Sequence, residues 1–157
     1  MPPARLDHSF FDGEVRPHLG SILLERGLVK HDQLDQALEE RARTGELLGE
    51  TLVRLGYVFE DELARVLAAQ EGLEFVDVAA VSADPSAAAL LDMELSDRLR
   101  AIPLRFTDEA LVVAVADPLM PGLRQRLEEA TGWPVKLVVT TPSAVSTGWR
   151  LIRRRRI

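Results

Sequence analysis

The sequence predicts an α+β fold, in which an N-terminal four-helix unit made of two tandem helical repeats is packed on a C-terminal βαββαβ(α) domain. The first observation is a repetition: the stretch that begins at Leu19 returns 29 residues later, at Leu48, with its leucines and glycines in register. Such matches are typical of a duplicated supersecondary element. The second observation is a change after Gly72 to short runs of β-branched residues between turn residues, which is typical of strands.

These patterns divide the 157 residues into four parts. They are a leader (1–15), a duplicated helical repeat subdomain (16–71), an α/β subdomain (72–152) and a basic tail (153–157). With 46% hydrophobic residues, the chain has enough apolar material for a core, so we expect a folded protein rather than a disordered one.

The first repeat is expected to contain a short helix, a glycine stop and a longer helix. Pro17 suits the first turn of the short helix, and Gly27 suits a left-handed cap at its end. The longer helix covers about His31 to Ala42 and carries Leu34 and Leu38 on one face at helical spacing.

The second repeat follows the same plan. Its short helix covers Leu47 to Leu55 and ends before Gly56, and its longer helix runs from Glu60 to about Glu71. Leu63 and Leu67 lie on the buried stripe of that longer helix. We therefore expect a compact unit of four helices.

The α/β subdomain is predicted to contain strand, helix, strand, strand, helix, strand and helix, in that order. The strands cover residues 73–78, 101–106, 110–116 and 133–139, and the helical regions cover residues 84–100, 121–131 and 142–152. The first helical region is broken near Asp92, and the last helix carries Val145, Trp149 and Ile152 on one face. The first six elements match a split βαβ sheet covered by helices.

Composition excludes several classes of protein. The absence of cysteine removes disulfides, thiolate nucleophiles and thiolate metal sites. No apolar run approaches the roughly 20 residues of a membrane helix, and the amino terminus lacks a hydrophobic signal core, so we expect a cytoplasmic protein. Without the five arginines at 150 and 153–156, the 19 basic residues become 14 against 25 acidic ones, a balance of −11. A body that acidic would repel a nucleic-acid backbone.

No catalytic or metal-binding constellation is recognisable. The three histidines, His8, His18 and His31, lack metal-ligand spacing. A phosphate-binding loop with its lysine, a glycine-rich dinucleotide turn and a serine in a nucleophile-elbow setting are all missing. We therefore expect no enzyme activity, no metal and no cofactor.

Both ends of the chain leave alternatives open. Phe10 and Phe11 in the leader either cover a neighbouring hydrophobic groove or form an exposed docking handle for a partner. The arginines at 153–156 either form a solvated end that favours the dipole of the last helix, or bind acidic lipid or nucleic acid.

A Leu-Gly pair stands at the start of each short helix, as Leu19-Gly20 and as Leu48-Gly49. Free backbone N–H groups at a helix start can hold a phosphate, and a glycine lets a ligand approach closely. Two such starts related by a repeat would suit a ligand with two equivalent halves. Alternatively, the glycines only permit close helix crossing and the leucines only fill the core.

The double unit resembles the N-terminal domain of type II secretion and type IV pilus assembly ATPases, known as the MshE N-terminal (GspE/PilB N-terminal) domain. The matching residues are Leu19, Gly20, Gly27, Leu28, Val29, Leu34 and Leu38 in the first copy, and Leu48, Gly49, Gly56, Tyr57, Val58, Leu63, Leu67 and Gln70 in the second. Residues 111–118, 130–135 and 140–145 also resemble the second half of the family's domain. The ATPase domain that usually follows in this family is not expected in this chain.

The resemblance implies a non-catalytic regulatory or interaction module, and some members of the family bind cyclic di-GMP. The ligand-binding residues that it implies are His18, Leu19, Gly20, Leu34, Leu38, Arg41, Leu48, Gly49, Leu63, Leu67, Gln70 and Asp117. The motif is degenerate, because the family's leading Arg is His18 in the first copy and Leu47 in the second, and its closing Gln is Arg41 in the first copy.

The polar residues of this set have specific expected roles. Arg41 would pair with a guanine edge or stack on its face, and His18 would donate a hydrogen bond to phosphate. Asp117 would accept from guanine amino groups or organise a turn.

Two functions remain open. One is a cyclic di-GMP sensor, and the other is a protein–protein adaptor that has lost the nucleotide and docks a secretion, pilus or motility complex. In either case a partner would recruit the cytoplasmic module to the inner face of the membrane.

Overall fold

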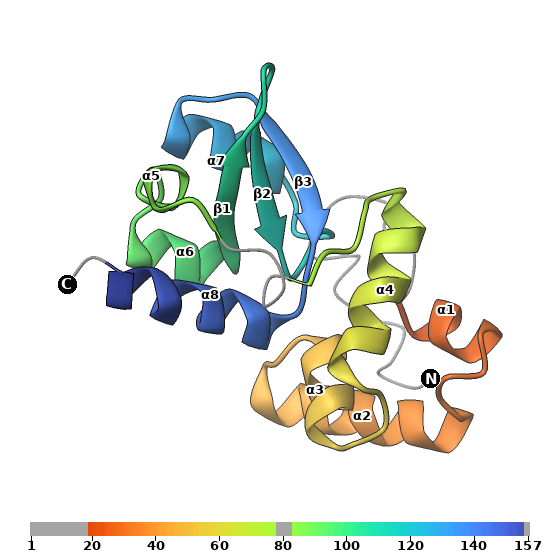
Figure 1. Cartoon of the computed structure of the whole chain (residues 1–157). Helices are drawn as coiled ribbons and strands as arrows, with labels where there is room; N and C mark the ends of the chain where they lie inside the picture. Colours follow the sequence, from red (N-terminus) through yellow and green to blue (C-terminus); the bar gives the residue numbers. More distant parts are fainter. Residues whose placement is uncertain (1–18, 78–82, 156–157) are drawn as a thin grey trace. The chain divides into compact units, whose positions relative to one another are not determined.

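The computed structural model of the chain describes residues 19–77 and 83–155, with side chains to Arg153 (Figure 1). The described residues form two compact units, one up to Leu63 and one from Ala64 onward. The leader, with Phe10 and Phe11, and the site residue His18 lie outside the described residues. The predicted domain boundaries and the predicted packing of one part on the other stay predictions.

The four predicted helices of the repeats are confirmed. They are α1 (Leu19–Glu25), α2 (His31–Thr44), α3 (Leu48–Arg54) and α4 (Glu60–Glu71), and α4 begins in the first unit and ends in the second. Gly27 and Gly56, which follow the two short helices, have φ angles of 70° and 79°. Only glycine adopts this left-handed conformation without strain, so the glycine stops have the physical cause that the sequence indicated.

The starts of α2, α3 and α4 share one device. In each, a side chain three residues into the helix accepts a hydrogen bond from the backbone N–H of the residue before the helix. The pairs are Gln33 with Lys30 at 3.0 Å, Glu50 with Leu47 at 3.4 Å and Glu62 with Phe59 at 3.2 Å. A full capping box also has a bond from the third N–H to the side chain of the cap residue. The bond described here is the other one, which needs no acceptor on that side chain.

The second unit contains a three-stranded sheet in the order β1 (Ala101–Phe106), β2 (Leu111–Val115), β3 (Val135–Val139). β1 and β2 pair antiparallel, whereas β2 and β3 pair in parallel and are joined through α7 (Leu123–Thr131). The expected split βαβ arrangement is therefore wrong, because that motif keeps another strand between its two parallel strands. Here the α7 crossover returns the chain directly beside β2.

The predicted strand at 73–78 is also corrected. Phe75 makes a single parallel bridge to Val139. One backbone hydrogen bond of 2.8 Å supports the bridge on each side of Phe75. Glu74 and Asp77 are exposed, whereas the partly buried Leu73, Phe75 and Val76 pack against the core. This stretch therefore contributes to the core beside the end of β3 without forming a full strand. Residues 78–82 lie outside the described residues.

The helical region before the sheet is broken at Asp92, as predicted. It consists of α5 (Pro85–Ala88) and α6 (Met93–Leu99). The carboxylates of Asp84 and Asp92 cap these helices by accepting from the backbone N–H groups of Ser86, at 2.9 Å, and Leu95, at 2.8 Å. Each cap satisfies a donor that a helix start would otherwise leave unpaired.

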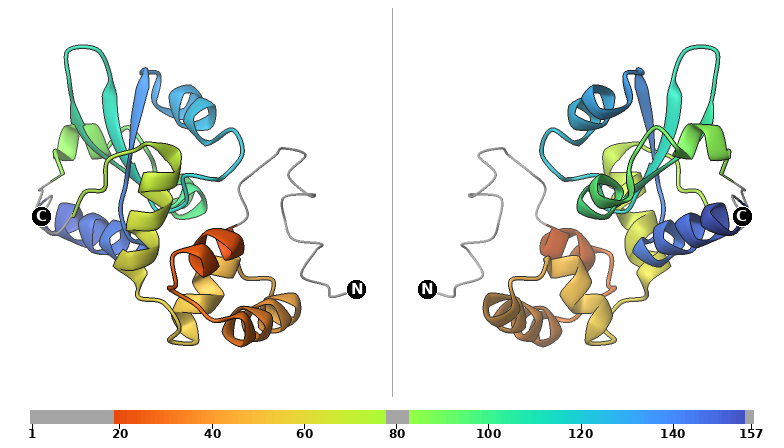
Figure 2. Two further views of the ribbon diagram at one scale, coloured as in Figure 1. Left: turned by 90° about the vertical axis from the view of Figure 1, so that its right-hand side faces the viewer. Right: turned by 90° about the vertical axis from the view of Figure 1, so that its left-hand side faces the viewer.

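The sheet is covered on both faces (Figure 2). α8 (Pro142–Arg155) packs on one face through Val145, Trp149 and Ile152, the side chains predicted to be buried. α7 packs on the other face through Leu123 and Leu127. The Trp149 indole donates to the Ala101 carbonyl at 3.2 Å, and the Ser96 hydroxyl donates to the same carbonyl. Within the described residues, no helix is long and apolar enough to span a bilayer.

Candidate functional site

The two glycines of the repeats are packed in the same way. A Cβ atom added to Gly20 in α1 would lie 3.1 Å from both Cδ atoms of Leu34 in α2. A Cβ atom added to Gly49 in α3 would lie 2.8 Å from Cδ2 of Leu63 in α4. Both partners of the second contact stand 29 residues after those of the first, so the duplication extends from the sequence to the packing.

The repeats are interleaved as well as equivalent. Cδ2 of Leu19, from the first repeat, lies 3.5 Å from the Cβ position of Gly49 in the second. Gly49 is therefore enclosed by leucines from both repeats, and Gly20, Leu48 and Gly49 are all buried. These contacts support the reading in which the glycines permit close helix crossing. A role in ligand approach stays a prediction.

The remaining apolar residues of the predicted site lie on the two longer helices. Leu34 and Leu38 are half-buried on α2, and Leu63 and Leu67 are buried on α4. In the first unit, the structure thus brings Leu34 to Gly20, and both Leu19 and Leu63 to Gly49. Leu67, Gln70 and Asp117 belong to the second unit.

The polar residues of the predicted site differ in exposure. Arg41 is half-buried in the last turn of α2, and Gln70 is exposed in the last turn of α4. Asp117 is half-buried after β2, where its Oδ1 accepts from the Leu119 N–H at 3.1 Å. That bond supports the turn-organising role expected as one alternative for Asp117.

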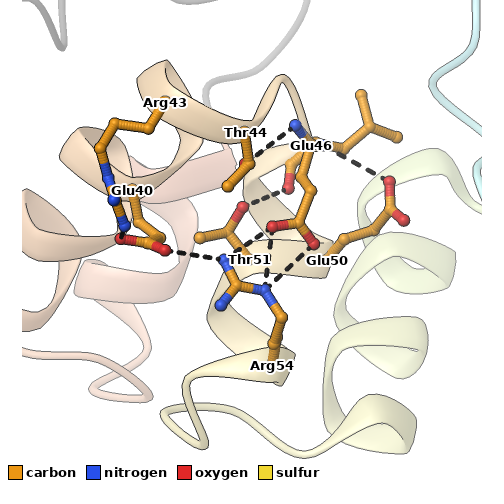
Figure 3. Close-up of polar contacts among 8 residues, drawn as sticks. Glu40, Arg43, Thr44, Glu46, Glu50, Thr51 and Arg54 are labelled. Atoms are coloured by element: carbon orange, nitrogen blue, oxygen red, sulfur yellow. Dashed lines mark hydrogen bonds and ion pairs between the residues drawn. The ribbon is translucent and has the colours of Figure 1, made fainter.

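Sequence reasoning missed an ion network that ties α2 to α3 (Figure 3). The Arg54 guanidinium donates to Glu46 from Nε at 2.9 Å and from Nη2 at 2.7 Å, and it reaches Glu40 at 3.3 Å. Arg43 also pairs with Glu40. Figure 3 shows the Arg54 side chain between the two carboxylates, one before and one after the turn at Gly45.

This network affects protonation and the geometry of the repeat junction. The hydrogen bond from Arg43, with a smaller one from Arg54, holds the pKa of Glu40 below its ordinary value. The hydrogen bond from Arg54 lowers the pKa of Glu46 in the same way. The carboxylates stay ionised, and the network holds α3, which carries Gly49, against the end of α2. The only signal in the sequence is the i,i+3 spacing of Glu40 and Arg43.

In the described part of the chain, no group of three or more His, Cys, Asp or Glu side chains could hold a metal ion. The pKa of the Asp84 carboxyl group is also lowered, and the cause is its hydrogen bonds from Ser86 at the start of α5. That perturbation belongs to a helix cap and not to a reactive site.

Comparison with known proteins agrees with this fold. A family model described as the MshEN domain matches residues 71–156. The type IV pilus assembly ATPase PilB of Thermus thermophilus is 34% identical over 145 residues, which is 92% of this chain and 15% of PilB. Bacteriophage adsorption protein B of Escherichia coli K12 is 30% identical over 136 residues, which is 87% of this chain and 18% of that protein.

Solved structures give the same result over both units. A structure of MshE with cdg, the nucleotide cyclic di-GMP, matches with a TM-score of 0.74 and 30% identity, over 87% of this chain and 99% of that one. The N-terminal domain of XpsE matches with a TM-score of 0.73 and 26% identity, over 89% and 98%. The predicted α+β fold and the resemblance read from the repeats are confirmed.

The extent of the matches is informative. The family model covers the α/β part, whereas the PilB alignment covers 92% of the chain and so includes the repeats. The chain spans only 15% and 18% of the curated relatives named above, but nearly all of the two solved chains. It therefore corresponds to an N-terminal domain of the pilus and secretion ATPases and not to their catalytic domain.

Proposed function

Because the chain belongs to the MshEN domain family, we propose that it is a non-catalytic regulatory module that binds cyclic di-GMP along its two repeats. The observation that carries this proposal is the duplication itself, in which each Leu-Gly helix start and the leucine packed on its glycine recur 29 residues later. Two equivalent apolar floors suit a ligand made of two equivalent halves. The similar structure of MshE with cyclic di-GMP supports the choice of ligand.

We propose the binding residues that the family resemblance implies. The leucines and glycines of the two repeats would form the floor under the ligand: Leu19, Gly20, Leu34, Leu38, Leu48, Gly49, Leu63 and Leu67. Arg41 and Gln70 would contact guanine at the edge, and His18 would donate to phosphate. With Leu47 in place of one family Arg, we expect weaker binding than a site with both arginines would give.

The module would act on a secretion, pilus or motility machine in the cytoplasm, where a partner recruits it to the inner face of the membrane. The family relationship supports this setting, because PilB is a type IV pilus assembly ATPase. Ligand binding across the repeats would stabilise one arrangement of their helices and thereby change the surface offered to the partner.

Titration calorimetry tests the proposal. We expect heat from cyclic di-GMP, about one ligand per chain, and a loss of affinity in Arg41→Ala and Gln70→Ala. Arg26→Ala is the matched control, because Arg26 is exposed after α1 and lies outside the predicted site. No heat at about 100 μM ligand, or equal affinity for GMP, would refute a site built for two halves.

A second candidate is a protein–protein adaptor that has lost the nucleotide. Leu47, at a position where the family has Arg, is 36% exposed, and Phe59 at the start of α4 is 76% exposed. Exposed apolar side chains favour protein contact over a charged nucleotide. In a pull-down, the adaptor would lose its partner when residues 1–15 are deleted, whether or not cyclic di-GMP is present. A partner that binds only with the nucleotide would contradict the adaptor.

A further inference from the structure

Positive charge is concentrated in the last part of the chain. Residues 130–157 contain Lys136, Arg150 and Arg153–Arg156 and no acidic residue, so the other 13 basic residues accompany all 25 acidic ones. α8 carries four of these arginines and no carboxylate. On the opposite side of the sheet, α7 carries two arginines and two glutamates. Among its charged residues α8 therefore has only basic ones, and it covers the face of the sheet opposite α7, as the ribbon in Figure 2 shows.

The packing of α8 fixes which side chains face water. Val145, Trp149 and Ile152 are 6%, 7% and 3% exposed, and the hydrogen bond from Trp149 to the Ala101 carbonyl holds the rotation of the helix. Arg150 and Arg153 are consequently exposed on the outer face. Within the described part of the chain, neither arginine has a carboxylate at ion-pair distance.

An apolar side chain lies among these arginines. Leu151 is 46% exposed, because a position two residues after the buried Trp149 lies on the opposite face of the helix. The outer face of α8 thus combines a leucine with guanidinium groups on aliphatic stems. This combination suits a surface that is negatively charged outside and apolar beneath.

We propose that the outer face of α8, formed by Arg150, Leu151 and Arg153, docks onto an anionic lipid bilayer. The arginines would lie among the headgroups, and Leu151 would reach the acyl boundary. The same helix offers a nucleic acid no base-stacking platform, because its one aromatic side chain, Trp149, is buried and hydrogen-bonded. The inference concerns a different surface from the cyclic di-GMP site and stands without it.

Vesicle co-sedimentation of the full chain tests this proposal. We expect binding to vesicles of phosphatidylcholine with about 30% phosphatidylglycerol, no binding to phosphatidylcholine alone, and weaker binding as salt increases. Arg150→Glu/Arg153→Glu should reduce the partition coefficient by about 30-fold or more, because each arginine contributes about fivefold at such a surface. Leu151→Ser should reduce it by about fivefold without any change in charge.

The matched control is Arg124→Glu/Arg126→Glu. These arginines are exposed on α7, and the variant changes the net charge by the same amount. It should bind anionic vesicles much as the unchanged chain does, with circular dichroism confirming that both variants are folded. An equal loss of binding in the α7 variant, or equal binding to neutral vesicles, would overturn the proposal. So would a Leu151→Ser variant that binds vesicles as well as the unchanged chain does but prefers single-stranded DNA.

Discussion

The contact between Gly49 and Leu63 leads to a sharp prediction for Gly49→Ala. In a helix this change alone stabilises by about 1 kcal/mol. Here the new Cβ atom would lie 2.8 Å from Leu63 Cδ2, a distance that real Cβ contacts do not show, and 3.5 Å from Leu19 Cδ2. Leu63 is only 9% exposed, so it can move only by displacing other core atoms. Overpacking of this kind costs about 1 to 3 kcal/mol.

We therefore expect Gly49→Ala to lower the free energy of unfolding by about 1 kcal/mol, measured by urea denaturation. Gly20→Ala is the matched control, because its Cβ would lie at 3.1 Å from Leu34, which is half-buried and free to give way. The free energy of unfolding of that variant should be nearly unchanged. A stabilised Gly49→Ala, or a Gly20→Ala that is the more damaging of the two, would refute the packing argument.

A double variant isolates the contact. Leu63→Ala alone should cost about 2 to 5 kcal/mol, because it leaves a cavity in a buried site. In the Gly49→Ala background the same truncation also relieves the overpacking, so its cost should be smaller. Strictly additive effects would show that the two residues do not press on each other.

Two further outcomes are expected. The pKa values of Glu40 and Glu46 are lowered from 4.5 in the folded chain, so the stabilisation by Arg54 should be complete above that pH and lost as the pH falls through the folded pKa values. Arg54→Met should thus have a lower free energy of unfolding than the unchanged chain at pH 7, as measured with urea, and the difference should shrink in acid. A difference that stays the same at both pH values would contradict this. Trp149→Phe should destabilise by about 1 to 2 kcal/mol in the same assay, since it loses a hydrogen bond and some packing while the Ala101 carbonyl keeps its other donor. An unchanged urea midpoint would contradict the second expectation.

The sequence was most informative where one residue determines local structure. Glycines at 27 and 56 ended the short helices because their positive φ angles suit no other residue as well. Asp92 marked the break between α5 and α6 because its carboxylate caps a new helix. The apolar stripe of α8 was also readable, since helical spacing alone places Val145, Trp149 and Ile152 on one face.

Strand order and ion pairing were not readable in this way. The same order of elements is compatible with β3 beside β2 or with another strand between them, and only the path of the α7 crossover decides. The apolar run at 73–78 resembled a strand, yet its described residues pair with the sheet only through the bridge from Phe75 to Val139. Arg54 meets Glu40 and Glu46 only after the turn at Gly45 folds α3 back on α2.

The position of Leu19 over Gly49 determines how this module can be divided. A fragment that ended at Gly45 would keep the first Leu-Gly start but remove the surface that Leu19 covers. A fragment that began there would uncover Gly49 on the side where Leu19 packs. The duplicated segment is thus two copies in its sequence but a single unit for cutting, grafting or exchange between proteins, and any transplant of the repeats should carry both copies together.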